Sequence, residues 1–501
     1  MTKRYIFFFI TILLLAGFGR MQSFGTIPTG FFCDEAAIGY NAYSLLHSGT
    51  DEYGIRLPVF FRSFGDFKNP VFIYSAVPFV ALFGLTETAV RLLAWSYGIL
   101  TIGAIYLLGV KVLGKKAGLI AALILSILPW HYHFSRIGFE LISSVFWTTV
   151  AVLAAYNSLR RIHWYPIACA AFLASFLSYT ATKIYIPLLF ILFYFVNMRV
   201  VRTWVKDARF RVVSGFFLLL AVCLVAPSVQ HGSFFSRWNQ VKTENMQFKT
   251  MAQAYMNHFS PVFLFQKGDI DFPGQFVTRH SIRGIGELYW FQLPFILIAL
   301  VSFFYSPRLK KALPILFLLL LYPLGSIFTG VPPQATRSVI GTIPLVLLTA
   351  IGITMAASWM KGKRWILLIA SFMLTLIVAV SFGQFLKLYQ AYPQYSSDYW
   401  GWQYGPEVII PKLMADSSLY DELYLQPEFN GAEIFFKFYD PQKTCPHCRL
   451  GTPKEHLKPG VKQLFVVTPQ YYQKSPVPLQ ILDIVSYPNG TPAFYFTRVK
   501  K

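Results

Sequence analysis

The feature that most constrains this sequence is a series of long apolar runs that are almost free of charged residues. Several of these runs extend over about 16 to 22 residues, and in a helix that rises about 1.5 Å per residue this length crosses a hydrocarbon core of about 30 Å. A membrane β-barrel would instead show segments of about ten residues with alternating polarity. Because 55% of the residues are hydrophobic and only 13% are charged, an ordinary soluble protein is disfavoured as well. The pattern therefore predicts a polytopic α-helical membrane protein.

Eleven of these runs are predicted to span the membrane. The first follows Lys3 and Arg4 and resembles a signal peptide, but no convincing cleavage site follows it, so we expect an uncleaved first span. A further run, Val71–Leu85, is short for a span and contains Pro78, which suggests a re-entrant or interfacial segment. The eleven runs lie at residues 5–20, 88–110, 117–130, 141–158, 164–180, 184–200, 212–229, 288–306, 312–330, 338–357 and 365–386.

The basic residues predict the orientation of these spans. The chain has 44 Lys and Arg against 22 Asp and Glu, and its formal charge of +22 is concentrated in short clusters between apolar runs. This placement favours membrane orientation over nucleic-acid binding. If Val71–Leu85 does not cross, every cluster lies on the side of Lys3 and Arg4, which is cytoplasmic by the positive-inside rule. The clusters are Lys111/Lys115/Lys116, Arg160/Arg161, Arg199/Arg202/Lys206/Arg209/Arg211, Arg308/Lys310/Lys311 and Lys361/Lys363/Arg364.

This topology divides the chain into two predicted domains. Residues 1–390 form the membrane module, with a first external loop at 21–87 and a long external loop at 230–287. Residues 391–501 are polar and rich in tyrosine, and turn signals separate strand-like runs, which predicts a small extracytoplasmic α/β domain. The predicted strands are Glu433–Phe438, Gln463–Thr468 and Ala493–Val499.

Two short motifs in the C-terminal domain receive structural interpretations. Asn489-Gly490-Thr491 matches an N-glycosylation acceptor, but an Asn-Gly pair between two apolar runs favours a hairpin turn. The segment from Cys445 to Cys448 is a C-x-x-C that resembles the active-site sequence of thiol oxidases. Its flanks are typical of loops, so a local disulfide or a partial zinc knuckle is favoured over redox catalysis.

The candidate chemistry starts at Asp34 and Glu35 in the first external loop. Apolar and aromatic side chains follow this pair at helical spacing, which predicts an amphipathic helix at the membrane surface with Asp34 as its N-cap. Capping is one sufficient reason for Asp34. Adjacent carboxylates at a water–lipid boundary also suit a base that removes a proton from an acceptor hydroxyl, while cations hold an anionic leaving group.

Candidate cations come from the neighbouring external segments. Lys68 either helps to bind such an anion or anchors its helix to lipid headgroups. Arg136 and Glu140 stand four residues apart and either pair on one helix face or form a phosphate-binding arginine held by Glu140. His131 and His133 could ligate a metal, but no further ligand is recognisable by spacing.

The long external loop and the later loop at Pro332-Pro333 add further candidates. Asp269 and Asp271 form an Asp-x-Asp pair like that of soluble nucleotide-sugar transferases, but nucleotide sugars are cytosolic and this loop is predicted to face outside. Arg279 and His280 form a cationic pair that could bind a phosphate or diphosphate. Arg337, at the outer end of a span, either snorkels to headgroups or joins them.

Several of these motifs together resemble the bacterial branch of glycosyltransferase family 39, which includes protein O-mannosyltransferases and aminoarabinose transferases of GT-C architecture. The resemblance covers roughly residues 1–390. It departs from the family at Asn69, where members often have a second proline, and at the extra residues Phe272–Thr278. The matching segments are Asp34-Glu35, Lys68-Asn69-Pro70, Pro129 to Glu140, His258 to Asp269, Arg279-His280-Ser281, Gly286 to Tyr289 and Ala335 to Ser338.

The resemblance implies a sugar donor carried on a polyprenyl phosphate and an inverting transfer that uses no nucleotide sugar. Asp34 would be the base, with Glu35 as its catalytic neighbour, and Lys68 would lie near the donor phosphate. The full set of candidate phosphate ligands is Lys68, Arg136, Arg279, His280 and Arg337, with Glu140 and Asp269 in support. No cofactor is required by this chemistry, and assistance by a divalent metal stays open.

The resulting hypothesis is a glycosyltransferase of the cell membrane that acts on a lipid, glycan or protein hydroxyl at the extracytoplasmic face. Its partners would be the polyprenyl-linked donor, that acceptor and membrane lipids, without nucleic acid. The main alternative is a lipid or solute transporter or flippase. Such proteins place ionisable groups near the middle of broken spans, whereas here the acids and cations gather in outer loops. A non-catalytic scaffold that presents the external domain is the third hypothesis.

Overall fold

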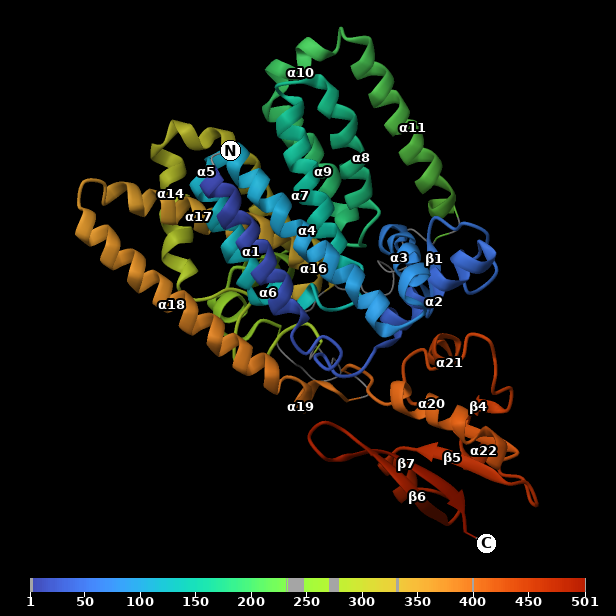
Figure 1. The fold of residues 1–501 in the computed structure, drawn as a ribbon. Helices are drawn as coiled ribbons and strands as arrows, with labels where there is room; N and C mark the ends of the chain where they lie inside the picture. Colours follow the sequence, from blue (N-terminus) through green and yellow to red (C-terminus); the bar gives the residue numbers. More distant parts are fainter. Residues whose placement is uncertain are drawn as a thin grey trace.

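A computed structural model describes residues 3–230, 232, 247–269, 279–329, 333–398 and 401–500 of the chain. Most residues before position 391 form long helices that run side by side as a bundle, and the C-terminal residues form a unit with a sheet at one end of it (Figure 1). The N-terminus lies near the opposite end of the bundle (Figure 1).

Each of the eleven predicted spans contains a helix. Among the described residues, six helices are long and apolar enough to cross a membrane, or seven if α9 and α10, which are bent by 87° relative to each other, form one broken span. The polytopic helical prediction is confirmed, while the number of eleven spans stays a prediction. The helices are α1 (Lys3–Met21), α4 (Glu87–Leu113), α5 (Lys115–Ile127), α7 (Leu141–Ser158), α8 (Tyr165–Phe176), α9 (Thr182–Val196), α10 (Met198–Trp204), α11 (Ala208–Gln230), α14 (Gln292–Tyr305), α15 (Leu313–Leu321), α17 (Thr342–Trp359) and α18 (Arg364–Ala391).

Glycines allow close approach between neighbouring helices of the bundle. A Cβ placed on Gly109 of α4 would lie 2.8 Å from the Cα of Gly118 on α5. On α17, a Cβ on Gly352 would collide with the backbone of Phe295 on α14. Lipid tails are as apolar as the side chains, so close packing of this kind is one of the forces that holds membrane helices together.

The end of the bundle next to the C-terminal unit, here named the outer end, carries short helices and a small hairpin (Figure 1). The predicted short run Val71–Leu85 lies mostly in α3 (Pro70–Phe83), a 14-residue helix that is too short to qualify as a span. These elements are α2 (Cys33–Ser48), β1 (Phe61–Ser63), β2 (Asp66–Lys68), α3 (Pro70–Phe83), α6 (Pro129–Phe134), α13 (Phe248–Asn257), a π-helical turn (Val262–Lys267) and α16 (Ala335–Ser338).

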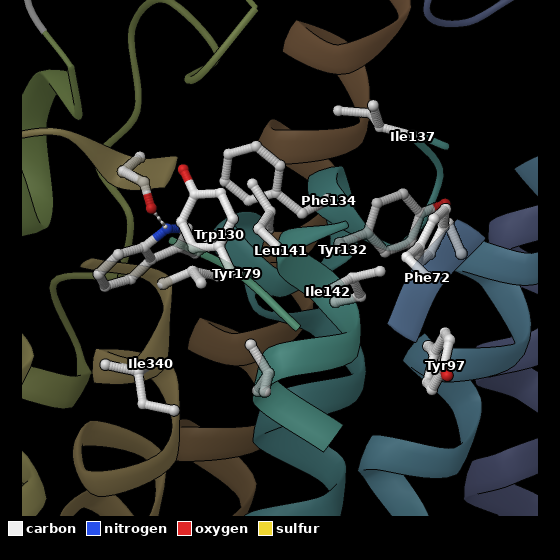
Figure 2. Packing of buried hydrophobic residues seen from close by; sticks show 14 of the residues in the cluster. Phe72, Tyr97, Trp130, Tyr132, Phe134, Ile137, Leu141, Ile142, Tyr179 and Ile340 are labelled. Carbon is white, nitrogen blue, oxygen red and sulfur yellow. Dashed lines mark hydrogen bonds between the residues drawn. The ribbon is translucent and has the colours of Figure 1, made fainter. Parts of the chain in front are cut away.

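Aromatic residues on α6 fix this outer end to the bundle. Trp130 and Phe134 are buried beside Leu141 and Tyr179 (Figure 2). The indole Nε1–H of Trp130 donates a 2.9 Å hydrogen bond to the carbonyl of Ala335, the first residue of α16 (Figure 2). Segments 205 residues apart in sequence are thereby joined.

The C-terminal unit is an α/β arrangement around a five-stranded mixed sheet with the strand order β4-β3-β5-β7-β6. Strand β3 pairs in parallel with β4 and with the central strand β5, and β7 pairs antiparallel to both β5 and β6. The elements are α19 (Pro393–Ser396), α20 (Pro406–Ala415), β3 (Glu422–Leu425), α21 (Glu433–Tyr439), β4 (Cys448–Leu450), α22 (Pro453–His456), β5 (Gln463–Val467), α23 (Pro469–Gln473), β6 (Leu479–Ser486) and β7 (Pro492–Val499).

Local predictions in this unit are mostly confirmed. Two of the predicted strands correspond to β5 and β7, and Asn489-Gly490 turns between β6 and β7 as a hairpin, with Gly490 at φ +82°. Cys445 and Cys448 form a disulfide. The prediction of a strand at Glu433–Phe438 is wrong, because these residues form α21.

The reason for that error lies in the spacing of the apolar side chains. The buried residues of α21 are Ile434, Phe435 and Phe438, which lie on one face of a helix and on alternating faces of a strand. This face packs on α2: the ring of Phe438 lies 4.9 Å from that of Phe31, and a Cβ on Gly39 would lie 2.6 Å from Phe438. The C-terminal unit therefore rests directly on the helix that carries the predicted catalytic acids.

Candidate active site

The two predicted catalytic acids lie in the first turn of α2. The helix starts at Cys33 with Phe32 as its N-cap residue, so the prediction of Asp34 as the N-cap is wrong by two positions. Carboxylates in a first helical turn interact favourably with the positive end of the helix dipole. The two side chains nevertheless face different surroundings, since that of Asp34 is 27% exposed and that of Glu35 is fully buried.

Glu35 is held in a buried ion pair. Arg91 of α4 binds it through two hydrogen bonds of 3.0 Å, from Nε to Oε1 and from Nη2 to Oε2. The backbone N–H of Gly138 donates a third bond of 2.7 Å to Oε1. The Arg91 guanidinium also binds the carbonyls of Pro28 and Gly30. The Glu35 carboxylate thus ties α2, α4 and the segment before α7 together.

The side chains of Asp34 and Lys68 form an ion pair at the outer end of the bundle. The Nζ atom of Lys68 lies 2.5 Å from Asp34 Oδ1, and the β1–β2 hairpin presents this lysine through the register Phe61↔Lys68. Burial alone would lower the pKa of Lys68, but the nearby carboxylates of Asp34 and Glu140 raise it above its ordinary value. The lysine is therefore cationic at neutral pH and lies beside a carboxylate that solvent can reach.

Glu140 binds the segment that carries Lys68. It is the N-cap residue of α7 and accepts hydrogen bonds from Asn69, at 3.3 Å from the backbone N–H and at 3.1 Å from Nδ2. Because Asn69 follows Lys68 directly, Glu140 fixes the backbone that carries the lysine. Burial raises the pKa of Glu140 to about 7, although Lys68 and Asn69 counteract the shift.

The predicted helical pair between Arg136 and Glu140 is wrong. The helix α6 ends at Phe134 and α7 begins at Leu141, so the two residues do not lie on one continuous helix. Arg136 instead donates hydrogen bonds of 2.7 to 2.9 Å to the carbonyls of Arg20, Gln22, Ser23 and Ile27. Its guanidinium anchors the chain segment that leads from α1 to α2.

Arg279 and His280 point to different neighbours. The Arg279 guanidinium lies 4.6 Å above the ring of Phe32, at the start of α2, and its Nε is buried without a hydrogen-bond partner among the described residues. His280 Nδ1 lies 2.9 Å from Asp269 Oδ2. Asp269 Oδ1 also accepts a 2.5 Å hydrogen bond from the N–H of Ala335. Only Arg279 of this group is thus brought next to the first turn of α2.

The remaining predicted residues lie in the helices α16 and α6. Arg337 lies in α16, two residues after Ala335, and is half-buried. His133 Nε2 lies 2.7 Å from the Arg279 carbonyl, and His131 Nδ1 lies 3.3 Å from Arg20 Nη2. Within the part of the chain that the structure describes, no group of three or more His, Cys, Asp or Glu could hold a metal ion. Asp271 lies outside the described residues.

Sequence reasoning missed two cations of the site. Arg91 lies within the apolar run 88–110, where a charged residue requires a buried partner, and the acids of the preceding external loop were the available candidates. Lys183 lies in the first turn of α9, between the apolar runs 164–180 and 184–200, within electrostatic range of Glu140 and Asp66. Both residues are charged side chains within or between apolar runs, which is visible in the sequence. The sequence does not show which acidic residues lie next to them.

Comparison with known proteins gives a family match and a fold. Residues 68–229 match the family described as dolichyl-phosphate-mannose-protein mannosyltransferase. ArnT from Cupriavidus metallidurans bound to undecaprenyl phosphate superposes with a TM-score of 0.59 at 13% identity, covering 99% of this chain and 98% of ArnT. No curated protein sequence matches the chain. The chain has a GT-C-like fold, and residues 68–229 match the mannosyltransferase family.

A second similar GT-C structure extends the likeness. The archaeal oligosaccharyltransferase AglB from Archaeoglobus fulgidus, in complex with an inhibitory peptide and a dolichol-phosphate, superposes with a TM-score of 0.55 at 14% identity. That match covers 89% of this chain and 64% of AglB. At such identities the likeness shows the GT-C-like fold alone.

Proposed function

We propose that this GT-C protein is an inverting glycosyltransferase that moves a sugar from a polyprenyl-phosphate donor to a hydroxyl of a lipid, glycan or protein acceptor. The observation that carries the proposal is the pair formed by Asp34 and Lys68, a reachable carboxylate and an ammonium group 2.5 Å apart. The helix α2, which carries Asp34, lies where the helix bundle meets the C-terminal unit (Figure 1). A structure with the same fold holds undecaprenyl phosphate, which supports a donor of this class.

The proposed reaction is a single displacement at the anomeric carbon. The acceptor oxygen attacks this carbon from the face opposite the phosphate, and the carbon–oxygen bond to the phosphate breaks. Asp34 takes the proton of the acceptor hydroxyl. The electron pair of the broken bond leaves with the polyprenyl phosphate, whose charge Lys68 stabilises.

The ion pair between Asp34 and Lys68 gives this mechanism an order of events. A donor phosphate that binds Lys68 competes with the Asp34 carboxylate for the same ammonium group. The carboxylate released from Lys68 is a stronger hydrogen-bond acceptor for the incoming hydroxyl. Binding of the donor therefore prepares the base, which limits proton removal in the absence of donor.

The other predicted site residues receive distinct roles. Arg279 is the second phosphate-binding cation, because its guanidinium lies over Phe32 next to the Asp34 turn. Glu35 and Arg136 are positioning residues, since Glu35 is bound by Arg91 and Arg136 donates hydrogen bonds to backbone carbonyls. Glu140 orients Lys68 through Asn69. His280, Asp269 and Arg337 belong to a neighbouring cluster that shapes the outer end of the donor site.

We place this site on the extracytoplasmic side of the cell membrane, with the N-terminus in the cytoplasm. The short basic loops and the positive-inside rule support this sidedness. The opposite positions of the N-terminus and the C-terminal unit in Figure 1 agree with it. Thiol labelling of a cysteine introduced after residue 390 tests the orientation, and labelling from the cytosolic side alone would contradict it.

The function is tested by sugar transfer in reconstituted vesicles. Radiolabelled polyprenyl-phosphate sugars are supplied, and lipid and protein acceptors are compared. We expect transfer by the native protein and a fall of at least about 100-fold in Asp34→Asn, since a general base contributes about 10²- to 10⁴-fold. Asp416→Asn in the C-terminal unit is the matched control. Normal turnover in Asp34→Asn would remove the proposed base, and movement of labelled donor across the bilayer without a new glycosidic bond would favour the flippase.

A further inference from the structure

The helix that carries Asp34 has no cap from its own neighbourhood. Its first backbone N–H groups have no intrahelical partners, as at every helix start. Such groups are usually satisfied by a Ser, Thr, Asp or Asn side chain at the N-cap position. Here the N-cap residue is Phe32, which has no oxygen in its side chain and makes no capping bond.

The missing acceptor comes from the C-terminal unit. The Oε1 atom of Gln403 accepts a 2.7 Å hydrogen bond from the backbone N–H of Cys33, the first residue of α2 and 370 positions away in sequence. Gln403 is only 2% exposed, and its Nε2 donates to the carbonyl of Asn430 at 3.4 Å. Its backbone φ of +54° lies in the left-handed region, which is uncommon for glutamine.

The neighbouring residue Trp402 fixes this contact in place. A Cβ on Gly30 would lie 2.5 Å from the Trp402 carbonyl oxygen, so the two backbones are in close contact. The Trp402 ring meets that of Phe32 edge to face, with 5.4 Å between the centroids. Its Nε1 donates a 2.8 Å hydrogen bond to the hydroxyl of Tyr392. A non-glycine residue with positive φ that is held by such packing points to a functional constraint.

We infer that Gln403 is a positioning residue for the proposed transferase: it caps the catalytic helix from the C-terminal unit and thereby holds Asp34 against Lys68. Asp34 directly follows the capped residue, so fraying of the first turn displaces its carboxylate. Lys68 is carried by a separate hairpin and keeps its place. Loss of the cap therefore lowers turnover more than it weakens donor binding. The inference rests on the proposed function for its catalytic part only.

The test compares two substitutions of similar size in the full-length protein in lipid nanodiscs. Gln403→Leu removes the acceptor oxygen, whereas Gln403→Glu keeps an acceptor and adds a negative charge that a helix start favours. Gln473→Leu, at an exposed position on α23, is the control for an added leucine. Amide hydrogen exchange over residues 33–36 reports the cap without any substrate. Transfer from undecaprenyl-phosphate mannose to the acceptor class found active gives kcat and the KM for the donor.

We expect exchange over residues 33–36 to rise about fivefold in Gln403→Leu, as for loss of an ordinary helix cap, and to stay unchanged in the other two variants. We also expect kcat to fall by a similar or larger factor in Gln403→Leu with little change in KM, and Gln403→Glu to restore it. Unchanged exchange in Gln403→Leu would overturn the cap. Raised exchange with unchanged kcat would overturn the positioning role. If the native protein transfers no sugar from any donor, the proposed function fails while the exchange result still decides the cap.

Discussion

Asp34 and Glu35 are adjacent residues on one helical turn, but the regions around them differ sharply. On the Glu35 side, a fully buried carboxylate meets a planar guanidinium through two hydrogen bonds and receives a third from a backbone amide. On the Asp34 side, a carboxylate that is 27% exposed meets the ammonium group of Lys68. The difference suggests that the first pair holds the structure together and that the second is available for exchange with a ligand.

The choice of cation fits this division. An arginine presents a rigid fork that matches a carboxylate in two places, whereas a lysine is a compact charge on a flexible stem. Arg91 also binds two backbone carbonyls, so removing it would disturb several segments. Lys68 moves by rotation about its side-chain bonds and can turn from Asp34 to a phosphate without a change in the backbone.

The largest effect on stability is expected from Arg91→Met. This variant leaves the Glu35 carboxylate buried without its partner, and breaking a buried pair in this way costs about 3 to 5 kcal/mol. Thermal unfolding in detergent micelles measures the loss. The double variant Glu35→Gln with Arg91→Met removes both charges and is expected to recover part of the stability. If Asp34→Asn destabilises the protein as much as Arg91→Met, the contrast between the two sides is wrong.

A smaller effect, on catalysis and not on folding, is expected from Lys68→Met. Loss of one well-placed group that stabilises transition-state charge lowers turnover by about 10²- to 10³-fold. The pair with Asp34 is partly exposed, so we expect its loss to change the free energy of unfolding by no more than about 1 kcal/mol. Kinetics at varied donor concentration measure the effect on turnover, and thermal unfolding of the same sample measures the effect on stability. Lys474→Met, at an exposed position in the C-terminal unit, is the control, and a strongly destabilised Lys68→Met would contradict the assignment.

The sequence was informative where one local signal was sufficient. Runs of apolar residues predicted the helices of the bundle, and Asn489-Gly490 predicted a hairpin that is present. The Asp34-Glu35 and Lys68 motifs pointed to residues that the structure brings together. Hydrophobic length and turn chemistry depend on few residues, so they can be recognised without knowledge of the fold.

The sequence failed where a partner comes from a distant segment. Nothing around Glu35 identifies Arg91, 56 positions away, and nothing around Cys33 identifies Gln403. The expected pairing of Arg136 with Glu140 assumed one helix, but the chain breaks between α6 and α7. The guanidinium of Arg136 instead binds four backbone carbonyls at the end of α1 and in the segment after it, and a sequence gives no sign of carbonyls that need a donor.

The smallest expected effect concerns pH and sharpens the Asp34 side of the comparison. Glu140 has its pKa raised to about 7 by burial, so its carboxylate is ionised above this pH and protonated below it. Only the ionised form offers both oxygens as full acceptors to the two N–H donors of Asn69. We therefore expect kcat/KM for the donor to fall as the pH drops through about 7, because the backbone that carries Lys68 loses its support.

The variant Glu140→Gln resembles the protonated form, since its amide has one acceptor oxygen and a donor that faces another donor. We expect its kcat/KM to be low at pH 8 by a fewfold to about tenfold, which corresponds to about 1 kcal/mol for one lost hydrogen bond, and to be flat between pH 6 and 8. Histidines ordinarily titrate in this range, so His280→Gln is measured alongside and should keep the pH dependence. If His280→Gln flattens the profile and Glu140→Gln does not, the pH dependence arises in the cluster of Asp269 and His280, and Lys68 does not depend on Glu140.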